Sequence, residues 1–171
     1  MAGCVAALHN KNIKSVLADA PFFYFDDQYM VIMGLYSGMS VHVSGGMSVS
    51  RFLDWIEEHE IELAYFPTPI LETPPSSRET ATSLKKFIGF ALNAELTHLV
   101  EERFNVLTRD SFGMTEVGVG LLVPDTVNSD AALDSCGLPA PFRDVKIVDD
   151  NGDEVESGSP GELWIKGPGI I

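Results

Sequence analysis

The chain has 171 residues, of which 45% are hydrophobic and 9% aromatic. This composition excludes disordered and collagen-like proteins and suits one globular domain, or one domain with a small appendage. Its 11 basic residues are scattered and face 25 acidic ones, for a formal net charge of −14. Because such a charge repels phosphate backbones and anionic lipid, we expect neither a nucleic-acid nor a membrane partner.

The cellular compartment is inferred from the ends and the cysteines. The apolar start, residues 1–8, is short and has no basic region ahead of it, so it does not read as a signal peptide. No apolar run in the sequence approaches the ~20 residues that a transmembrane helix needs. The spacing of Cys4 and Cys136 is typical of neither a disulfide framework nor a metal site. We therefore predict a reduced, cytoplasmic protein.

The first part of the chain alternates between short strands and helices. Val16–Ala18 is a short apolar run. Almost every residue from Gln28 to Tyr36 is apolar, which predicts a helix buried on all sides, with Gly38 as its C-cap. A strand over Met39–Val43 follows, and then a helix whose Phe52, Trp55 and Ile56 share one face.

The alternation continues through the middle of the chain. Ile61–Phe66 and Lys86–Ala91 are apolar segments of strand length. Asn93 can cap a helix over Ala94–Phe104, with Leu96, Leu99, Val100 and Phe104 as its apolar stripe, and residues 106–107 open another strand. This order predicts an α/β fold in which crossover helices join parallel strands.

The pattern changes after Glu116, where no helical period returns. Two further strands, Val145–Val148 and Leu163–Ile165, flank strong turn signals, and the acidic band there reads as the solvated rim of a hairpin. We divide the chain into an α/β piece, residues 1–125, and a small all-β, barrel-like piece, residues 126–171.

Most candidate sites have an ordinary explanation. The four histidines have no cysteine or carboxylate at ligand spacing, which argues against a metal site built from them. The adjacent pair Asp26 and Asp27 can bind a hard cation, but neighbouring side chains usually point apart. We favour Asp27 as the cap of the helix that begins near Gln28.

One segment, residues 110–120, combines chemical groups that suit a nucleotide. Phe112 can stack on a flat ring, and Gly113 lets the backbone approach it. The hydroxyl of Thr115 can donate to a phosphate oxygen, and Glu116 offers Mg²⁺ a hard oxygen. From these residues alone, a strand-ending turn with a capping threonine is an equally good explanation.

Two sets of motifs resemble a known family. Residues 111–116, with the sequence SFGMTE, are similar to the Tyr-Gly-x-Thr-Glu motif of adenylate-forming enzymes, which include acyl-CoA synthetases and luciferases. The segments GLP at 137–139, VKIVD at 145–149, NGDEV at 151–155 and GELWIKGP at 161–168 follow in the family's order and spacing. Several shorter segments, PFFYFDDQ at 21–28 among them, most resemble carnitine- or crotonobetaine-CoA ligases.

The resemblance implies an activity and its ligands. The parent enzyme joins a small-molecule carboxylate to ATP with Mg²⁺, releasing pyrophosphate, and then transfers the acyl group to coenzyme A. It also implies that the α/β piece contributes to the nucleotide and acyl sites. The family's phosphate loop with its lysine should lie before residue 1, and the ribose aspartate and C-terminal domain after residue 171. We therefore expect a fragment that is inactive without these missing N- and C-terminal parts.

The resemblance also assigns roles to individual residues. Thr115 and Glu116 take the catalytic positions on the α-phosphate and on Mg²⁺. Phe112 replaces the adenine-stacking tyrosine, keeping the ring without its hydroxyl. The nucleotide-binding residues implied are Gly89, Phe90, Ala91, Phe112, Gly113, Met114 and Thr115. The acyl-pocket residues implied are Tyr24, Asp27, Gly118 and Val119.

A second hypothesis comes from another class of protein. Phe112 and Tyr24, which stands where the family commonly has histidine, both depart from the family pattern. These departures are consistent with a stand-alone, non-catalytic binding or interaction module that keeps the fold.

Overall fold

The computed structural model describes residues 12–171. The predictions about residues 1–8 and Cys4 lie outside the described residues. Among the described residues, no helix is long and apolar enough to cross a membrane.

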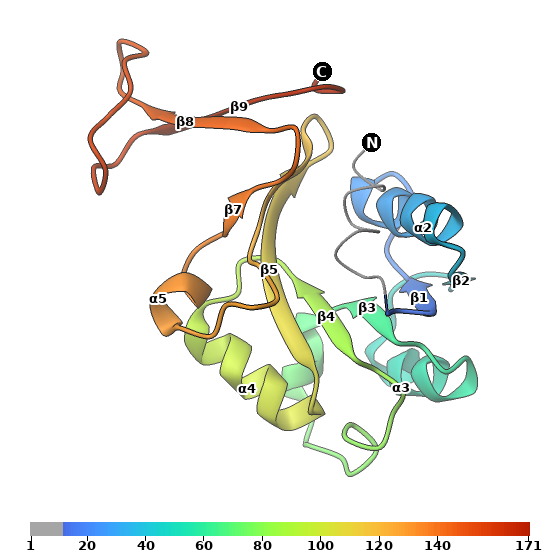
Figure 1. Cartoon of the computed structure of the whole chain (residues 1–171). Coiled ribbons are helices and arrows are strands. Elements are labelled where there is room, and N and C mark those ends of the chain that lie inside the picture. Colours follow the sequence, from blue (N-terminus) through green and yellow to red (C-terminus); the bar gives the residue numbers. More distant parts are fainter. Residues whose placement is uncertain (1–11) are drawn as a thin grey trace.

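The main body is a seven-stranded mixed sheet with the order β2-β1-β3-β4-β5-β6-β7 (Figure 1). The first five strands run parallel and the last two pairings are antiparallel. The strands are β1 (Ser15–Ala18), β2 (Ser40–Val43), β3 (Leu63–Tyr65), β4 (Lys86–Gly89), β5 (Leu107–Met114), β6 (Gly118–Leu122) and β7 (Leu138–Pro139). The α/β fold with parallel strands is therefore confirmed.

Helices cover both faces of this sheet. Side chains of α3 (Val49–Glu58) and α4 (Ala94–Phe104) pack with Leu17 and Phe87 in one core cluster. Side chains of α2 (Phe25–Ser37) pack with Val16 and Ala18 in another. Successive β1 residues therefore point to opposite faces, as the pleat of a strand requires. A 3₁₀ helix, Thr68–Glu72, follows β3.

The helix α2 differs from its prediction in two ways. It begins at Phe25, and its N-cap residue is Tyr24, so Asp27 lies within the first turn and does not cap the helix. Its outer face is also open: Ile32, Leu35 and Tyr36 are 51%, 74% and 66% exposed. The expectation of a helix buried on all sides is wrong, because apolar composition does not reveal which face a neighbouring element covers. The left-handed C-cap at Gly38, with φ 70°, is confirmed.

The second half of the chain begins as a β-hairpin. β5 runs on to Met114 and pairs antiparallel with β6, so residues 110–114 belong to a strand rather than to the loop after one. The single-turn helix α5 (Asp130–Leu133) and β7 follow, and β7 extends the main sheet through β6. A separate two-stranded sheet comprises β8 (Asp144–Val148) and β9 (Glu162–Lys166). The division of the chain at residue 125 stays a prediction.

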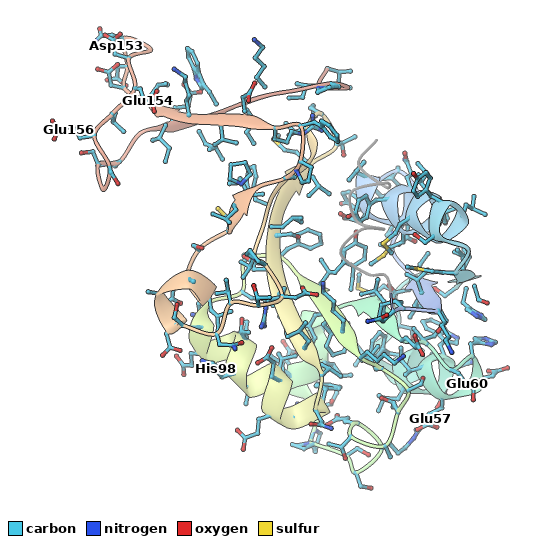
Figure 2. All side chains as sticks on the ribbon, viewed as in Figure 1. Glu57, Glu60, His98, Asp153, Glu154 and Glu156 are labelled. Atoms are coloured by element: carbon cyan, nitrogen blue, oxygen red, sulfur yellow. The ribbon has the colours of Figure 1, made fainter. Side chains whose placement is uncertain are left out.

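The acidic band of the last hairpin lies in solvent. Figure 2 shows Asp153, Glu154 and Glu156 at its outer end, away from the main body. All three residues are exposed, and Glu154 forms an ion pair with Lys146 at 3.1 Å. The prediction of a solvated hairpin rim is confirmed.

Candidate functional site

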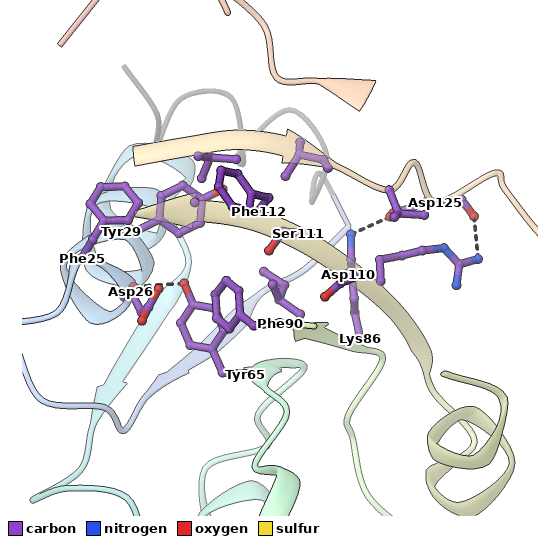
Figure 3. A pocket seen from close by; sticks show the side chains of 16 residues that line it. Phe25, Asp26, Tyr29, Tyr65, Lys86, Phe90, Asp110, Ser111, Phe112 and Asp125 are labelled. Carbon is purple, nitrogen blue, oxygen red and sulfur yellow. Dashed lines mark hydrogen bonds and ion pairs between the residues drawn. The ribbon is translucent and has the colours of Figure 1, made fainter. Parts of the chain in front are cut away.

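A pocket lies where the parallel strands β3, β4 and β5 end. Open α/β sheets bind ligands beyond the carboxyl ends of their strands. Figure 3 shows aromatic side chains from four separate parts of the chain around this hollow. The aromatic lining residues are Phe25, Tyr29, Tyr65, Phe90 and Phe112. The pocket therefore offers flat apolar surfaces to a planar ligand.

Phe112 enters the pocket from β5. Its strand is fixed on one side by parallel pairing with β4 and on the other by antiparallel pairing with β6, where the register shifts between Phe112 and Gly113. A side chain on Gly113 would meet the carbonyl oxygen of Gly118 at 2.7 Å, so glycine permits the close approach of the two strands. The neighbouring Ser111 hydroxyl donates to the carbonyl of Gly89 at 3.3 Å.

The segment after β4 forms a second wall. Gly89 is buried, and a β-carbon there would collide with the side chain of Leu92. Ala91 has φ 55°, a left-handed conformation that non-glycine residues adopt at some cost. The ring of Phe90 is 44% exposed and lies 5.3 Å from the ring of Tyr65, centroid to centroid. This turn thus directs Phe90 into the pocket lining while Gly89 and Ala91 stay outside it.

Thr115 and Glu116 lie at the exposed turn of the β5–β6 hairpin. Neither side chain accepts or donates a hydrogen bond within the described part of the chain, and both are outside the pocket lining. Met114, which precedes them, is 48% exposed. The hydroxyl and the carboxylate are therefore free to meet a ligand that extends from the pocket along the hairpin.

The turn holds one acidic group rather than a metal cluster. In residues 12–171, no three His, Cys, Asp or Glu side chains gather to hold a metal ion. Mg²⁺ in nucleotide sites usually needs only one or two carboxylates, with phosphate and water as its other ligands. Glu116 therefore fits as a Mg²⁺ ligand only together with a bound phosphate.

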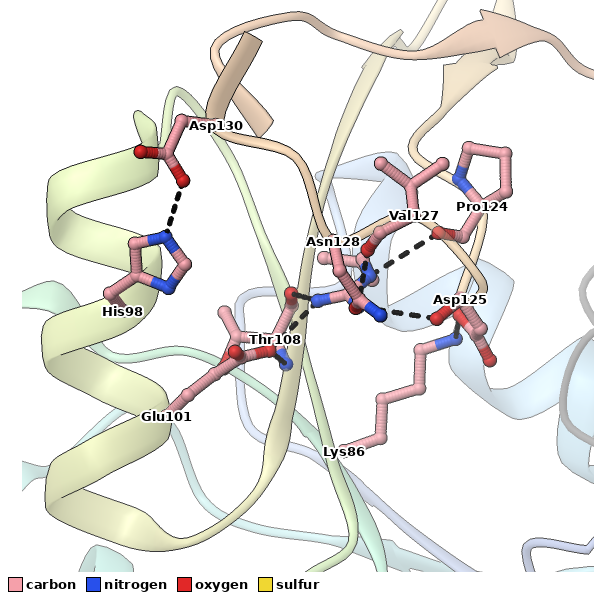
Figure 4. Close-up of polar contacts among 10 residues, drawn as sticks. Lys86, His98, Glu101, Thr108, Pro124, Asp125, Val127, Asn128 and Asp130 are labelled. Carbon is pink, nitrogen blue, oxygen red and sulfur yellow. Dashed lines mark hydrogen bonds and ion pairs between the residues drawn. The ribbon is translucent and has the colours of Figure 1, made fainter. Parts of the chain in front are cut away.

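Two cationic side chains on the pocket wall are already paired. Lys86 donates to the Asp125 carboxylate at 2.6 Å. Arg109 is 4% exposed and pairs with Glu101 at 2.8 Å. Arg109 also donates to its own strand and to the segment after β6, whose Pro124, Asp125 and Val127 are labelled in Figure 4. Its acceptors there are the carbonyls of Thr108, Pro124, Asp125 and Val127 and the side chain of Asn128. Both cations therefore stabilise the wall of the pocket through their contacts within the chain.

Four carboxyl groups that line the pocket or lie close to its lining residues have raised pKa values. Asp26 and Asp110 line it, and burial raises the pKa of both carboxyl groups. Asp19 and Asp27, which are 3% and 0% exposed, lie deeper, and burial raises the pKa of each to about 6. For Asp27 the nearby carboxylates of Asp19 and Asp26 add to the rise, while the backbone N–H of Ala20 lowers the pKa in part.

The residues predicted for the acyl pocket are divided. Val119 lines the pocket, and Gly118, at φ 70°, begins β6 beside it. Tyr24 is 51% exposed and Asp27 is fully buried, and neither reaches the lining. Of all the predicted site residues, the structure brings Phe90, Phe112, Gly113 and Val119 together in the pocket.

Several lining residues escape sequence reasoning. Tyr29 and Tyr65 read as core residues of a helix and a strand, yet both reach the pocket, and the Tyr65 hydroxyl donates to the Asp26 carbonyl at 3.2 Å.

A histidine pair outside this pocket also escapes sequence reasoning. His42 and His59, seventeen positions apart in the sequence, stack with ring centroids 4.5 Å apart on the β2 side of the sheet. No spacing signal reveals these contacts, because crossover connections create them.

Comparison with known sequences identifies one matching family and several related enzymes. The sequence model of a family described as "AMP-binding enzyme" matches residues 3–171. A probable 4-coumarate–CoA ligase 2 of Dictyostelium discoideum is 26% identical over 98% of this chain and 32% of its own length. A feruloyl-CoA synthase of an Amycolatopsis species is 26% identical over 98% of this chain and 36% of its own. The chain thus spans about a third of these curated relatives.

Solved structures show the same fold. An O-succinylbenzoate coenzyme A synthetase from Bacillus subtilis, in complex with ATP and magnesium ion, superposes with a TM-score of 0.80 at 23% identity. This chain matches it over 99% of its own length and 36% of that chain. A benzoate CoA ligase from Burkholderia xenovorans matches at 20% identity and a TM-score of 0.80, over 99% of this chain and 37% of that one.

Proposed function

Because this chain belongs to the AMP-binding enzyme family, we propose that it is one part of an ATP-dependent acyl-CoA synthetase. Its relatives include acyl-CoA ligases, which supports an acid–thiol ligase as the whole protein. Such an enzyme activates a carboxylate as an acyl-adenylate with release of pyrophosphate, and then transfers the acyl group to the thiol of coenzyme A with release of AMP. The cytoplasmic location stays a prediction.

The proposal is carried by one observation: two aromatic rings from distant segments meet in a pocket beside a turn with a free hydroxyl and carboxylate. Phe90 and Phe112 supply the rings, and Thr115 and Glu116 supply the polar groups. In the proposed site the adenine stacks on Phe112 and lies along Gly89–Ala91. Gly113 and Met114 carry the backbone past it toward the phosphates.

At the turn, the proposed roles follow from the donor chemistry. The Thr115 hydroxyl donates to the α-phosphate, and the Glu116 carboxylate shares Mg²⁺ with phosphate oxygens and water. A bound Mg²⁺ would offset charge on the phosphates. Thr115 and Glu116 therefore bind and orient the nucleotide.

The acyl side of the site is proposed to begin at Val119 and Gly118. Asp27 and Tyr24 belong to it only if the missing parts of the protein, or a bound acyl group, change the surface at the start of α2. The named relatives act on aromatic carboxylates, which an aromatic pocket also suits. The narrower likeness to carnitine- or crotonobetaine-CoA ligases stays a prediction.

We propose that this chain alone binds ATP weakly or not at all and does not activate a carboxylate. The two cations beside the pocket, Lys86 and Arg109, are engaged with Asp125 and Glu101. Electrostatic stabilisation of the reacting phosphate usually contributes most to such catalysis. Incubation of the chain with ATP, Mg²⁺ and 4-coumarate should release no pyrophosphate. Release above background would show that the missing parts are dispensable.

The site itself is tested by saturation-transfer NMR with ATP and Mg²⁺. The wild-type chain should show contacts to the adenine protons, and Phe112→Ala should weaken binding about fivefold or more, since stacking of one base on one ring contributes ~1–3 kcal/mol. Phe142→Ala is the matched control because its ring is 68% exposed and lies outside the pocket. Equal binding by both variants, or no adenine contact in the wild type, would refute the proposed site.

A non-catalytic module with the same fold is the second candidate. It is favoured by Phe112, which lacks the hydroxyl of the family's tyrosine, and by Tyr24 in place of histidine. Nucleotide binding is compatible with both candidates, whereas carboxylate-dependent pyrophosphate release by the whole protein would argue for the synthetase.

A further inference from the structure

Arg143 lies directly before β8, and its guanidinium reaches back to the β5–β6 hairpin. Its Nη2 donates to the carbonyl of Val117 at 2.6 Å and its Nε to the carbonyl of Val119 at 3.1 Å. Its Nη1 donates to the carbonyl of Pro168, after β9, at 2.9 Å. One planar group thus joins the hairpin to both sides of the small sheet.

This arginine differs from three other arginines of the chain in what it binds. Arg78, Arg103 and Arg109 each form an ion pair with a carboxylate at 2.7–2.8 Å. Over residues 12–171, no carboxylate lies within ion-pair distance of Arg143. All of its observed contacts are with backbone carbonyls, so its charge fixes the position of the chain rather than that of another side chain.

The backbone around the Arg143 guanidinium leaves room for it. A β-carbon on Gly167 would lie 2.6 Å from Nη1 of Arg143 and 2.5 Å from the carbonyl oxygen of Phe142, so only glycine leaves room for the guanidinium. The N–H of Ile171 donates to the carbonyl of Glu116 at 3.1 Å. Residues that flank the small sheet therefore donate hydrogen bonds to the carbonyls of two successive turn residues, Glu116 and Val117.

The turn needs such support because it has little of its own. Within it, the backbone bond is from the N–H of Val117 to the carbonyl of Met114, at 3.1 Å. The side chains of Thr115 and Glu116 are exposed and unpaired within the described region. Fixing a backbone residue costs conformational entropy, and ligand binding must offset this cost if the fold has not already ordered the residue.

We propose that Arg143 is a positioning residue, which holds the turn at 115–117 in one conformation through the carbonyls of Val117 and Val119. This inference rests on the proposed function for its consequence, namely that the ordered turn presents Thr115 and Glu116 to Mg²⁺ and ATP. The positioning itself is a property of the chain without ligand.

Amide hydrogen exchange, measured by mass spectrometry on the full chain, tests the positioning without a nucleotide. Arg143→Gln should speed exchange in residues 113–119 about tenfold or more, while the central strand β4 keeps its protection. Arg143→Lys, which replaces the planar guanidinium by a single ammonium group, should give an intermediate exchange rate in residues 113–119. Arg51→Gln is the matched control, since Arg51 is exposed and pairs with Asp54 on α3.

A second measurement separates this inference from the proposed function. Binding of ATP with Mg²⁺, followed by NMR, should weaken about tenfold in Arg143→Gln and stay unchanged in Arg51→Gln. Unchanged exchange at 113–119, or an equal loss of protection in β4, would overturn the positioning role. If the wild-type chain binds no ATP, the proposed function fails, and the exchange rates still decide the role of Arg143. Should Arg143→Gln not fold, Arg143→Lys carries the same comparison.

Discussion

Asp27 shows what burial does to a single carboxyl group. It is fully buried in the first turn of α2, and neither carboxylate oxygen has a hydrogen-bond partner of good geometry among residues 12–171. Burial, with the carboxylate of Asp19 nearby, raises its pKa from 3.8 to about 6. The folded chain therefore favours the protonated form of this group more than the unfolded chain does.

This shift predicts how stability depends on pH. Between pH 3.8 and about 6 the folded state binds more protons than the unfolded state, so the free energy of unfolding falls as pH rises and levels off above that range. Asp27→Asn removes the titrating group and should raise stability above pH 7 by about 2–3 kcal/mol, since the pKa rises by about two units and one unit corresponds to about 1.4 kcal/mol.

Urea unfolding of the full chain at several pH values measures this effect. Asp150→Asn, at an exposed turn, is the control and should leave the pH dependence unchanged. A loss of stability in Asp27→Asn at pH 8 would show that the carboxylate is stabilised by an interaction absent from the described contacts.

The helix termini show how far local sequence signals reach. Asn93 caps α4 as predicted, and its side chain accepts a hydrogen bond from the N–H of Leu96 at 2.8 Å. Ser48 stands at the same position of α3, but its hydroxyl makes no capping bond and lies 3.3 Å from the Ser50 hydroxyl. Both residues fit the sequence rule for a cap, and only one satisfies a helix N–H.

The two caps should therefore differ in their contribution to stability. Asn93→Ala should lower the free energy of unfolding by about 1 kcal/mol, because it leaves the N–H of Leu96 without its acceptor. Ser48→Ala, the matched control, should change it by less than about 0.5 kcal/mol. Thermal or urea unfolding of both variants measures the difference, and equal losses would contradict the distinction.

The apolar stripe of α4 predicted only part of the buried face of the helix. In α4, Val100 and Phe104 are buried as predicted, but Leu99 is 49% exposed and Thr97 is buried at 1%. The stripe is rotated because the helix packs against both β5 and α5. The spacing of apolar residues in the sequence predicts that a helix has an apolar face. The elements that pack against the helix decide which of its side chains are buried.

At the scale of the whole molecule, Arg109 joins parts that are distant in the sequence. It lies on β5, pairs with Glu101 of α4, and donates to carbonyls of the segment after β6. That segment also supplies Asp125, the partner of Lys86 on β4. The network therefore fixes the wall of the pocket to the main sheet.

Removal of this arginine should affect the whole fold. Arg109→Met should lower the free energy of unfolding by about 3 kcal/mol or more, because Glu101, the buried Thr108 carbonyl and several half-buried carbonyls lose their donor. Arg51→Met removes an exposed pair and should cost less than about 1 kcal/mol. Urea unfolding compares the two, and a similar small loss in both would contradict a central role for Arg109.

The sequence by itself determined the α/β class, the order of most strands and helices, the Asn93 cap and the family, because these depend on local period, turn chemistry and motif spacing. Only the tertiary structure decided that residues 110–114 form a strand, that α2 has an open face, and that Tyr29 and Tyr65 join Phe90 and Phe112 around one pocket. These features depend on which surfaces the crossovers bring together. The physical reason is that local patterns record how a segment folds, whereas burial and pocket geometry depend on what packs against it.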